Sequence, residues 1–472
     1  MNNFKRIFLI TVDCLRADHV GCIGGVNLTP NIDRLARESV VFTKAFANGP
    51  GTNQSFPAIL TSTYFLMHGG MHLLPHYTTL AEVLSRHGFK TAAFHSNPFL
   101  SKGLGWGRGF HEFYDFIDVL KSPSATVARS RLSSKAIRFL NRMTKILKNE
   151  QMQSLLRRFY YRWNKFEVPY IEGALLNRYV TSWIRKNKKE KFFLWVHFMD
   201  PHRPYIPPRP YLNLFGTREE AFIFDTLIDP KIRQGISMDD LRKLKRLYEG
   251  EVRYVDCCIG NLIEFLQDQD LMDDSILILS ADHGEAFNEH GKLTHAYDVV
   301  YNEVIHVPLL IYGLADRAMV LDEYVQLLDI PSTIVDVLGI KQPYTFLGDS
   351  LISLLEGKEQ HRPIFSESAK PDLINLRYDT SKRVVSCIMK DWKLIVNELW
   401  KTIELYNIAK DFKEKENLIE SESEVRERLS VIIEEHLIFE KSFKLRLKSK
   451  VTDRKEDQRT IKNSTSGLRE FL

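Results

Sequence analysis

The 472-residue chain is predicted to fold as an α/β protein with a mostly parallel central sheet covered by helices. Short apolar runs rich in β-branched and aromatic residues alternate with amphipathic helical patterns, which is typical of such sheets. A hydrophobic content of 44% is enough for a large core. The predicted strands are Ile7–Asp13, Thr91–His95, Phe192–Phe198, Ser275–Asp282 and Pro308–Tyr312. The predicted helices are Thr78–His87, Leu241–Leu266 and Ile330–Leu338.

The composition indicates which classes of partner and which cellular compartment to expect for the protein. The formal net charge of +5 is modest for this length, so no nucleic-acid partner is expected. The first 12 residues lack the long apolar stretch of a signal peptide, and no run approaches the roughly 20 apolar residues of a membrane span. The five cysteines show neither metal-ligand spacing nor a disulfide framework. A reducing, cytoplasmic location is therefore expected.

The chain is expected to have two folded parts. Residues 1–345 carry the strand and helix alternation and form the predicted catalytic domain. Residues 346–440 contain shorter strand-like pieces and a helix, so they are predicted to form a smaller α+β subdomain. A charged tail at 441–472 is expected to be partly mobile. The pieces of the subdomain are Pro363–Ser366, Arg383–Met389, Trp392–Val396 and the helix Ser423–His436.

A basic segment interrupts the first domain. Residues 121–191 contain 18 Lys and Arg residues and four Glu residues, a net charge of +14. A helical insertion with solvated basic side chains is the favoured interpretation. The alternative is a cationic surface that attracts an anionic substrate, a glycan or lipid headgroups.

Polar side chains follow three predicted strands where each strand ends. Asp13 and Asp282 close two strands, His283 comes next, and His202 follows a third strand. Ligands of parallel sheets bind beyond the carboxyl ends of the strands, so these groups are expected to form one site for a divalent cation. Oxygen ligands suit Ca²⁺ or Mg²⁺, whereas His283 also admits Mn²⁺ or Zn²⁺. Each acid alone is as readily explained as a helix cap.

A hydroxyl side chain follows the dipeptide Pro50-Gly51. Thr52 is predicted to lie at a helix N-terminus, where backbone N–H groups favour an anion. A Thr hydroxyl beside a metal can act as a nucleophile. The alternative is that Thr52 only caps the helix.

The order of these motifs along residues 5–420 resembles that of sulfatases, which belong to the alkaline-phosphatase-like superfamily. The resemblance implies an alkaline-phosphatase-like sandwich with a smaller C-terminal subdomain. The motifs are Asp13-Cys14-Leu15-Arg16-Ala17-Asp18-His19, Thr29-Pro30-Asn31-Ile32-Asp33-Arg34-Leu35-Ala36, Asp200-Pro201-His202-Arg203-Pro204-Tyr205, Asp282-His283-Gly284-Glu285, Glu289-His290-Gly291, Tyr301-Asn302-Glu303, Val307-Pro308-Leu309, Asp391-Trp392-Lys393-Leu394 and Glu404-Leu405-Tyr406.

The resemblance also implies roles for individual residues. Asp13, Asp282 and His283 would hold one divalent cation, with Thr52 beside it as nucleophile and metal contact. His202 would contact the ester and protonate the leaving oxygen. Two further candidates for substrate binding are His295, which could instead lie at a second metal position, and Arg16, which could instead order the turn after Asp13.

The sequence departs from the sulfatase pattern at its nucleophile. Sulfatases convert a Cys or Ser at this position into formylglycine, and Thr52 cannot be converted, so no formylglycine is expected. Gln54 and Phe56 replace the Pro and Arg of that pattern, and Cys14 replaces the second of two paired acids. An attacking Thr is similar to the nucleophile of nucleotide pyrophosphatase/phosphodiesterases and phosphoglycerol transferases of the superfamily.

Three functions remain open at this point. A metal-dependent sulfuric ester hydrolase acting on an anionic ester, of a glycan or a lipid, is the first. A phosphodiester or phosphonate hydrolase, or a phosphoryl-type transferase, that uses Thr52 is the second. A metal-binding member without catalytic activity is the third.

Overall fold

The computed structural model describes residues 4–116, 170–217, 220–221, 236–358, 362–372 and 377–467, and side chains as far as residue 447. Residues 117–169, which hold most of the basic segment, lie outside this description. So does the end of the predicted tail, residues 468–472.

Eight strands form the central sheet, in the order β4-β3-β5-β1-β6-β7-β2-β8. Every neighbouring pair is parallel except the two that involve β7, so β7 alone runs against the other strands. The predicted α/β class with a mostly parallel sheet is therefore confirmed. The strands are β1 (Arg6–Val12), β2 (Ser39–Phe46), β3 (Lys90–Phe94), β4 (Glu112–Tyr114), β5 (Phe192–Phe198), β6 (Ser275–Ala281), β7 (His306–Tyr312) and β8 (Met319–Gln326).

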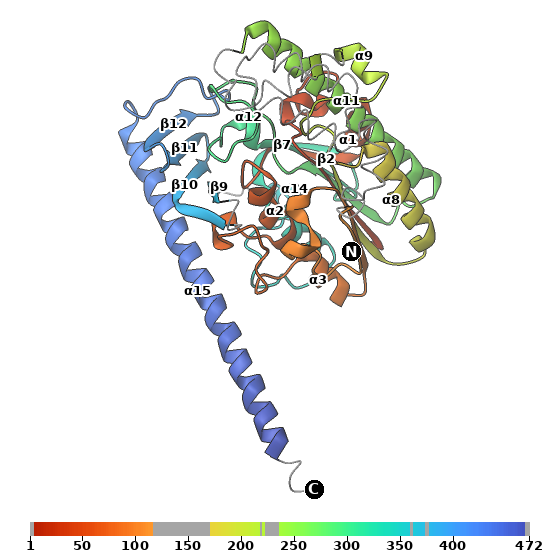
Figure 1. The fold of residues 1–472 in the computed structure, drawn as a ribbon, viewed down its shortest axis with the longest axis vertical. Helices are drawn as coiled ribbons and strands as arrows, with labels where there is room; N and C mark the ends of the chain where they lie inside the picture. The colour runs from red at the N-terminus through yellow and green to blue at the C-terminus, as the bar shows by residue number, and fades with distance from the viewer. Residues whose placement is uncertain are drawn as a thin grey trace, which may run out of the picture.

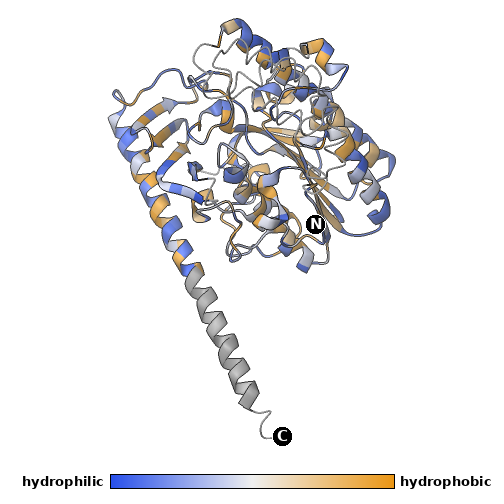
Figure 2. Ribbon diagram, in the orientation of Figure 1, coloured by the Kyte–Doolittle hydropathy of each residue, from blue (hydrophilic) through white to orange (hydrophobic). Residues whose placement is uncertain are grey.

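The middle strands are buried on both faces. Nearly every residue of β1, β5 and β6 is inaccessible to solvent, which explains their continuous apolar sequence. Figure 2 shows these strands as an orange band inside the molecule. Side chains of this interior form one continuous apolar core.

Helices cover both faces of the sheet (Figure 1). Two of them begin at side-chain caps: Thr79 and Glu82 form a capping box at the start of α3, and Ser237 caps α11. One group of helices consists of α1 (Pro30–Ala36), α8 (Gly173–Asn187), α9 (Tyr211–Phe215) and α11 (Met238–Asp268). The other consists of α2 (Thr52–Thr61), α3 (Leu80–Arg86), α13 (Asp329–Val337) and α14 (Ile352–Leu355).

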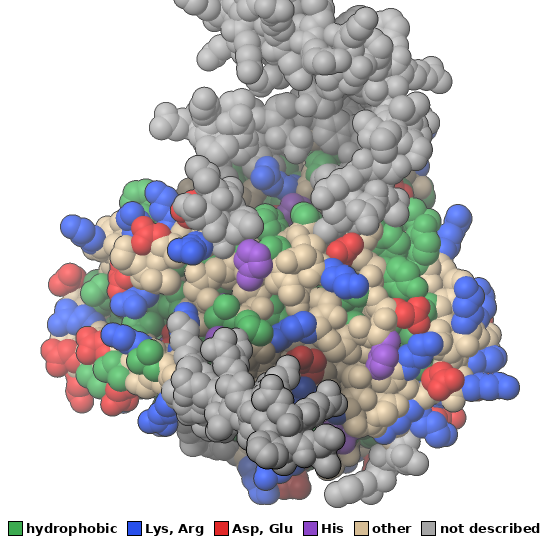
Figure 3. Space-filling view, turned by 60° about the horizontal axis from the view of Figure 1, so that its bottom comes forward, with side chains coloured by type: hydrophobic (Ala, Val, Ile, Leu, Met, Phe, Trp, Pro, Cys, Tyr) green, Lys and Arg blue, Asp and Glu red, His purple; other side chains and the backbone are tan. Residues whose placement is uncertain are grey.

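Helix α8 forms the described end of the basic segment. It packs on β3 and β5 through Leu176, Val180, Trp183 and Ile184, and its Lys and Arg residues lie on the outer side. This part of the segment is therefore a regular sheet-covering helix. On the face shown in Figure 3, described Lys and Arg side chains are interspersed with Asp and Glu.

A second sheet of four antiparallel strands follows, in the order β12-β11-β10-β9. The long helix α15 packs against this sheet and then extends beyond it (Figure 1). The predicted helix ended at His436, which is wrong, because α15 continues to Gly467. The elements are β9 (Ile364–Asp372), β10 (Arg377–Met389), β11 (Trp392–Asn397), β12 (Thr402–Asn407) and α15 (Ser423–Gly467).

Among the described residues, no helix combines the length and apolar character needed to cross a bilayer. All five cysteines are free thiols.

Candidate functional site

The site forms where four adjacent strands of the central sheet end. Strands β3, β5, β1 and β6 are neighbours and parallel, so their carboxyl ends meet at one edge. Asp13 directly follows β1, and Asp282 and His283 directly follow β6. Asn97 follows β3, and His202 follows β5 after a short turn. The sheet order thus brings together groups that are distant in sequence.

Asp13 is the centre of the polar contacts. Its Oδ1 lies 3.6 Å from His283 Nε2, and its Oδ2 lies 3.4 Å from His197 Nε2. Asp282 Oδ2 lies 3.6 Å from the same His283 nitrogen. All four side chains are fully buried. This spacing leaves the donor atoms facing one another without direct hydrogen bonds.

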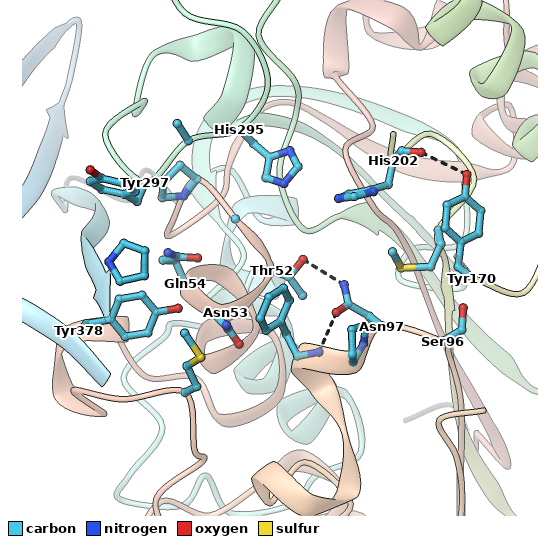
Figure 4. A pocket seen from close by; sticks show the side chains of 18 residues that line it. Thr52, Asn53, Gln54, Ser96, Asn97, Tyr170, His202, His295, Tyr297 and Tyr378 are labelled. Carbon is cyan, nitrogen blue, oxygen red and sulfur yellow. Dashed lines mark hydrogen bonds between the residues drawn. The ribbon is translucent and has the colours of Figure 1, made fainter. Parts of the chain in front are cut away.

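Thr52 lies beside these acids at the start of α2. Gly51 is the N-cap, so Thr52 is the first helical residue and a capping role does not account for it. Its hydroxyl lies near the Asp282 carboxylate and acts to lower the pKa of that group, against the larger effect of burial. Asn97 Nδ2 lies 3.3 Å from Thr52 Oγ1 and 3.2 Å from Asp13 Oδ2, so the Asn97 amide joins the hydroxyl to the acid pair. Figure 4 shows the bond between Asn97 and Thr52.

The buried donor set fits a divalent cation. Three buried atoms here have no hydrogen-bond partner among the described residues, namely Asp282 Oδ2, His283 Nε2 and His197 Nε2. Leaving such atoms unsatisfied is costly, and a cation would satisfy them. His283 Nδ1 donates to the Gly284 carbonyl, which leaves a lone pair on Nε2 toward the acids. Carboxylate oxygen and imidazole nitrogen together are a common donor set for divalent metals.

The electrostatics of the acid pair are asymmetric. Burial raises the pKa of Asp13, but His202, His197 and His283 outweigh it and hold that pKa well below the usual range. Burial and the Asp13 charge raise the pKa of Asp282. Because metal ligands must be deprotonated, a cation here would compete with protons mainly at Asp282.

Two imidazoles lie at the open side of the site. His202 and His295 have ring centroids 5.2 Å apart, and the Tyr170 hydroxyl holds the His202 carbonyl at 3.1 Å. Burial lowers the pKa of His202. Burial also lowers the pKa of His295, but the Glu285 carboxylate outweighs it and raises that pKa overall. The two neighbouring rings therefore lie in different electrostatic surroundings.

A cavity of about 380 Å³ opens above Thr52. Its floor includes Thr52 and Asn97, and the rings of His202 and His295 point into it (Figure 4). Tyr378 of β10 forms part of the opposite wall, so the second sheet contributes to the cavity. The described lining contains aromatic, Met and Pro side chains and no Lys, Arg, Asp or Glu.

Arg16 lies outside this cavity lining. Its buried guanidinium donates to Asp18 and Glu289 and, over 2.8 Å, to the Glu285 carbonyl. These guanidinium bonds thus all stay within the protein. The geometry supports the ordering role for Arg16, and the expected substrate contact has no support in it.

The structure brings together the six other candidates, Asp13, Thr52, His202, Asp282, His283 and His295. Sequence reasoning assigned no role to Asn97 or His197. Asn97 lies in a Ser-Asn-Pro stretch that is typical of a turn, and His197 lies inside an apolar strand. The only available signal was that Asn97 follows a predicted strand and that His197 lies within one.

A family model described as Sulfatase matches residues 5–340. A second model, described as N-sulphoglucosamine sulphohydrolase, C-terminal, matches residues 289–438. Together they span both sheets.

Curated relatives agree with these matches. The arylsulfatase of Clostridium perfringens is 24% identical over 480 residues, covering 90% of this chain and 92% of that protein. The Homo sapiens arylsulfatase K is 25% identical and covers 69% of this chain. The Homo sapiens iduronate 2-sulfatase is also 25% identical and covers 65% of it. The chain matches only 61% and 59% of those two human proteins' lengths.

Solved structures share the fold. The phosphonate monoester hydrolase of Agrobacterium radiobacter has a TM-score of 0.68 and 21% identity, covering 93% of this chain and 96% of its own. A protein solved with its substrate D-glucosamine-2-N,6-O-disulfate has a TM-score of 0.67 and 17% identity, covering 92% and 98%.

Proposed function

Since the chain belongs to the sulfatase family and is a hydrolase acting on ester bonds, we propose that it hydrolyses a sulfuric ester with a divalent cation and Thr52. The observation that carries this proposal is the position of the Thr52 hydroxyl. It lies at the floor of a cavity, bonded to Asn97 and near the Asp282 carboxylate, beside buried donor atoms that lack partners among the described residues. The proposed nucleophile, the proposed cation ligands and the space for a substrate thus lie next to one another.

Asp13, Asp282 and His283 would hold the cation, with His197 on the other side of Asp13. A bound cation would supply positive charge for the nonbridging ester oxygens and for the Thr52 oxygen in the transition state. These residues keep the donor atoms oriented, because each carboxylate and imidazole is fixed by its neighbours.

In the first step the Thr52 oxygen attacks the sulfur atom, and the bond between sulfur and the leaving oxygen breaks. Thr52 gives its proton to water in the cavity, and His202 donates a proton to the leaving oxygen. In the second step a water molecule attacks the sulfo-threonine and gives its proton to His202. Sulfate leaves, and Thr52 takes a proton back from water. His202 thus acts as the acid in the first step, as expected from the sequence, and as the base in the second, so it returns to its starting protonation state.

Hydrolysis or transfer of a phosphate or phosphonate ester is the second candidate, and Thr52 is the observation that favours it. A Thr ester cannot break down through the hemiacetal route that formylglycine provides. Water must therefore attack the sulfur or phosphorus atom directly. A phosphoryl group on Thr52 suits that step better than a sulfo group, as in superfamily members that use Thr.

The substrate's organic part is proposed at the level of class. Relatives named for sulfated sugars suggest a sugar sulfate for this chain. The described cavity lining suits a group with an apolar or aromatic face. Contact of the basic segment with a glycan or lipid, and a cytoplasmic location, stay predictions. A member without catalytic activity is disfavoured, because the donor atoms and Thr52 are all in place.

The test is an assay of purified protein with an aryl sulfate, a phosphomonoester and a phosphodiester. Each substrate is combined with Ca²⁺, Mg²⁺, Mn²⁺ and Zn²⁺ after chelation of resident metal. The proposal expects cation-dependent release of sulfate from the aryl sulfate. Turnover of phosphoesters alone selects the second candidate, and no turnover with any combination refutes both.

A further inference from the structure

We propose a second metal site, for Zn²⁺ or a similar divalent transition metal, formed by Glu367, His436 and Glu440 where helix α15 meets the second sheet. This site is distinct from the Asp13 site. Glu367 lies on β9, and His436 and Glu440 lie on α15. One donor atom from each of the three side chains lies within 4.8 Å of the others. The inference does not depend on the proposed function.

The helical pair has the spacing that metal sites use. His436 and Glu440 are four residues apart, so they project from one face of α15. Glu367 of the facing strand completes the group across the interface between helix and sheet. Imidazole and carboxylate donors together suit Zn²⁺ better than Ca²⁺, which takes oxygen ligands. A water molecule would complete four-fold coordination.

Burial makes these groups unusual. Glu367, His436 and Glu440 expose 0%, 7% and 4% of their surface. Glu440 Oε1 is buried and has no hydrogen-bond partner among the described residues, although it lies beside the other two side chains. Two adjacent buried carboxylates are stable only if a proton, a cationic neighbour or a bound cation offsets their charge.

The surroundings hold the donors in place. Glu367 Oε2 accepts a bond from the Leu66 N–H at 3.0 Å, and its Oε1 lies 2.5 Å from His436 Nε2. The His436 ring stacks on Phe365 at 3.7 Å and meets Tyr64 edge-on. These contacts fix the two side chains close to each other, and a bound cation would replace the bond between His436 and Glu367 with one bond from each of them to the metal.

The bound metal would fasten α15 to the wall of the catalytic cavity. The Glu367 N–H donates to the Asn48 carbonyl, and the chain from Asn48 leads directly to Thr52. Strand β9 also ends at the cavity, where Pro371 forms part of the lining. The proposed role is therefore structural.

The alternative occupant of the cluster is a proton shared between Glu440 and Glu367. Burial and the Glu367 charge raise the pKa of Glu440 well above its usual range, while Lys444 and Arg383 oppose this. A shared proton would leave the protein's stability insensitive to chelation. The two occupants can thus be told apart by counting metal and by heating with a chelator.

The experiment loads full-length protein with Zn²⁺, removes loose metal, and counts bound zinc by mass spectrometry. His436→Gln and Glu440→Gln are compared with Glu435→Gln, an exposed neighbour on α15. We expect each of the first two variants to hold one equivalent fewer than the control. Asp282→Asn removes the catalytic equivalent and is expected to keep the second one.

Thermal unfolding provides an independent readout. A chelator is expected to lower the Tm of Asp282→Asn, which keeps the second site, and to leave that of the double variant Asp282→Asn/His436→Gln unchanged. Equal zinc content in His436→Gln, Glu440→Gln and Glu435→Gln overturns the proposal. Should His436→Gln misfold, the nearly isosteric Glu440→Gln decides the zinc count.

Discussion

The amide of Asn97 holds the nucleophile and a cation ligand at once. Its Nδ2 lies within 3.3 Å of both Thr52 Oγ1 and Asp13 Oδ2. Its Oδ1 accepts the Phe99 N–H, which fixes the orientation of the amide. The amide therefore sets the direction of the Thr52 hydroxyl and can stabilise negative charge on its oxygen.

Asn97→Ala should lower kcat by about 10²-fold, the usual effect of losing one oriented donor. The cation should remain bound, since its proposed ligands are untouched. Steady-state kinetics and metal content of the same preparation check this. Asn213→Ala, at an exposed position on α9, is the control and should behave as wild type. An unchanged kcat in Asn97→Ala would remove Asn97 from the mechanism.

His290 makes stability depend on pH. Its Nδ1 lies 2.8 Å from Glu303 Oε1 and its Nε2 lies 2.9 Å from the Glu414 carbonyl. Burial lowers the pKa of His290, but Glu303 outweighs burial and raises it to about 9. The unfolded value is about 6.5. The stabilisation is therefore complete below that value and is lost as pH rises through about 9.

When the pH is raised from 6.5 to 9.5, the free energy of unfolding should fall less in His290→Gln than in wild type. Denaturant unfolding across that range, with the exposed His87→Gln as control, measures the difference. Parallel curves for wild type and His290→Gln would show that this ion pair carries no pH dependence.

The sequence identified the residues that end strands and missed those whose role depends on strand order. Asp13, Asp282 and His283 directly follow strands. They could be predicted because ligands of parallel sheets bind beyond the carboxyl ends of the strands. His197 matters because β5 lies beside β1, and Asn97 matters because β3 lies on the other side of β5. That order results from long-range packing, which no local pattern encodes. For Arg16, the surrounding acids could not be foreseen from its position in the motif.

At the scale of elements, helix α15 packs against strands β10 and β11 of the C-terminal sheet. Its first half contributes buried Leu429 and Ile433 to the common core, while Val431 and Ile438 remain exposed. The sequence predicted this half because its apolar residues recur at helical spacing. The second half is rich in helix-forming charged residues but lacks a continuous apolar stripe, so its helical state was missed.

Leu429→Ala should destabilise the protein by about 2 to 4 kcal/mol, because it leaves a cavity under α15. Val431→Ala, two residues away and half exposed, should change stability by less than about 0.5 kcal/mol. Denaturant unfolding of both variants measures the contrast. Similar losses would mean that α15 does not pack as described.

Some strands could be predicted from a local sequence pattern, whereas others could not. The buried strands β1, β5 and β6 were predicted almost to the residue, because they are continuous apolar runs. Strand β8 was missed, because this edge strand carries Asp322 and Glu323 on partly exposed positions. Strand β2 was also missed, although it links β7 to β8.

At the scale of the whole molecule, two sheets cooperate in one site. The central sheet supplies the proposed cation ligands at its carboxyl edge. The second sheet supplies Pro371 and Tyr378 to the cavity wall, so both sheets line the same cavity. The central claim is that Thr52 performs the attack.

Turnover by Thr52→Ala, with bound cation counted in the same sample, tests that claim most directly. The account predicts a loss of at least about 10³-fold in kcat, because the nucleophile is gone while Asp13, Asp282 and His283 still hold the cation. Thr52→Ser, which keeps a hydroxyl, should retain part of the activity. Wild-type turnover by Thr52→Ala with its cation bound would contradict the account.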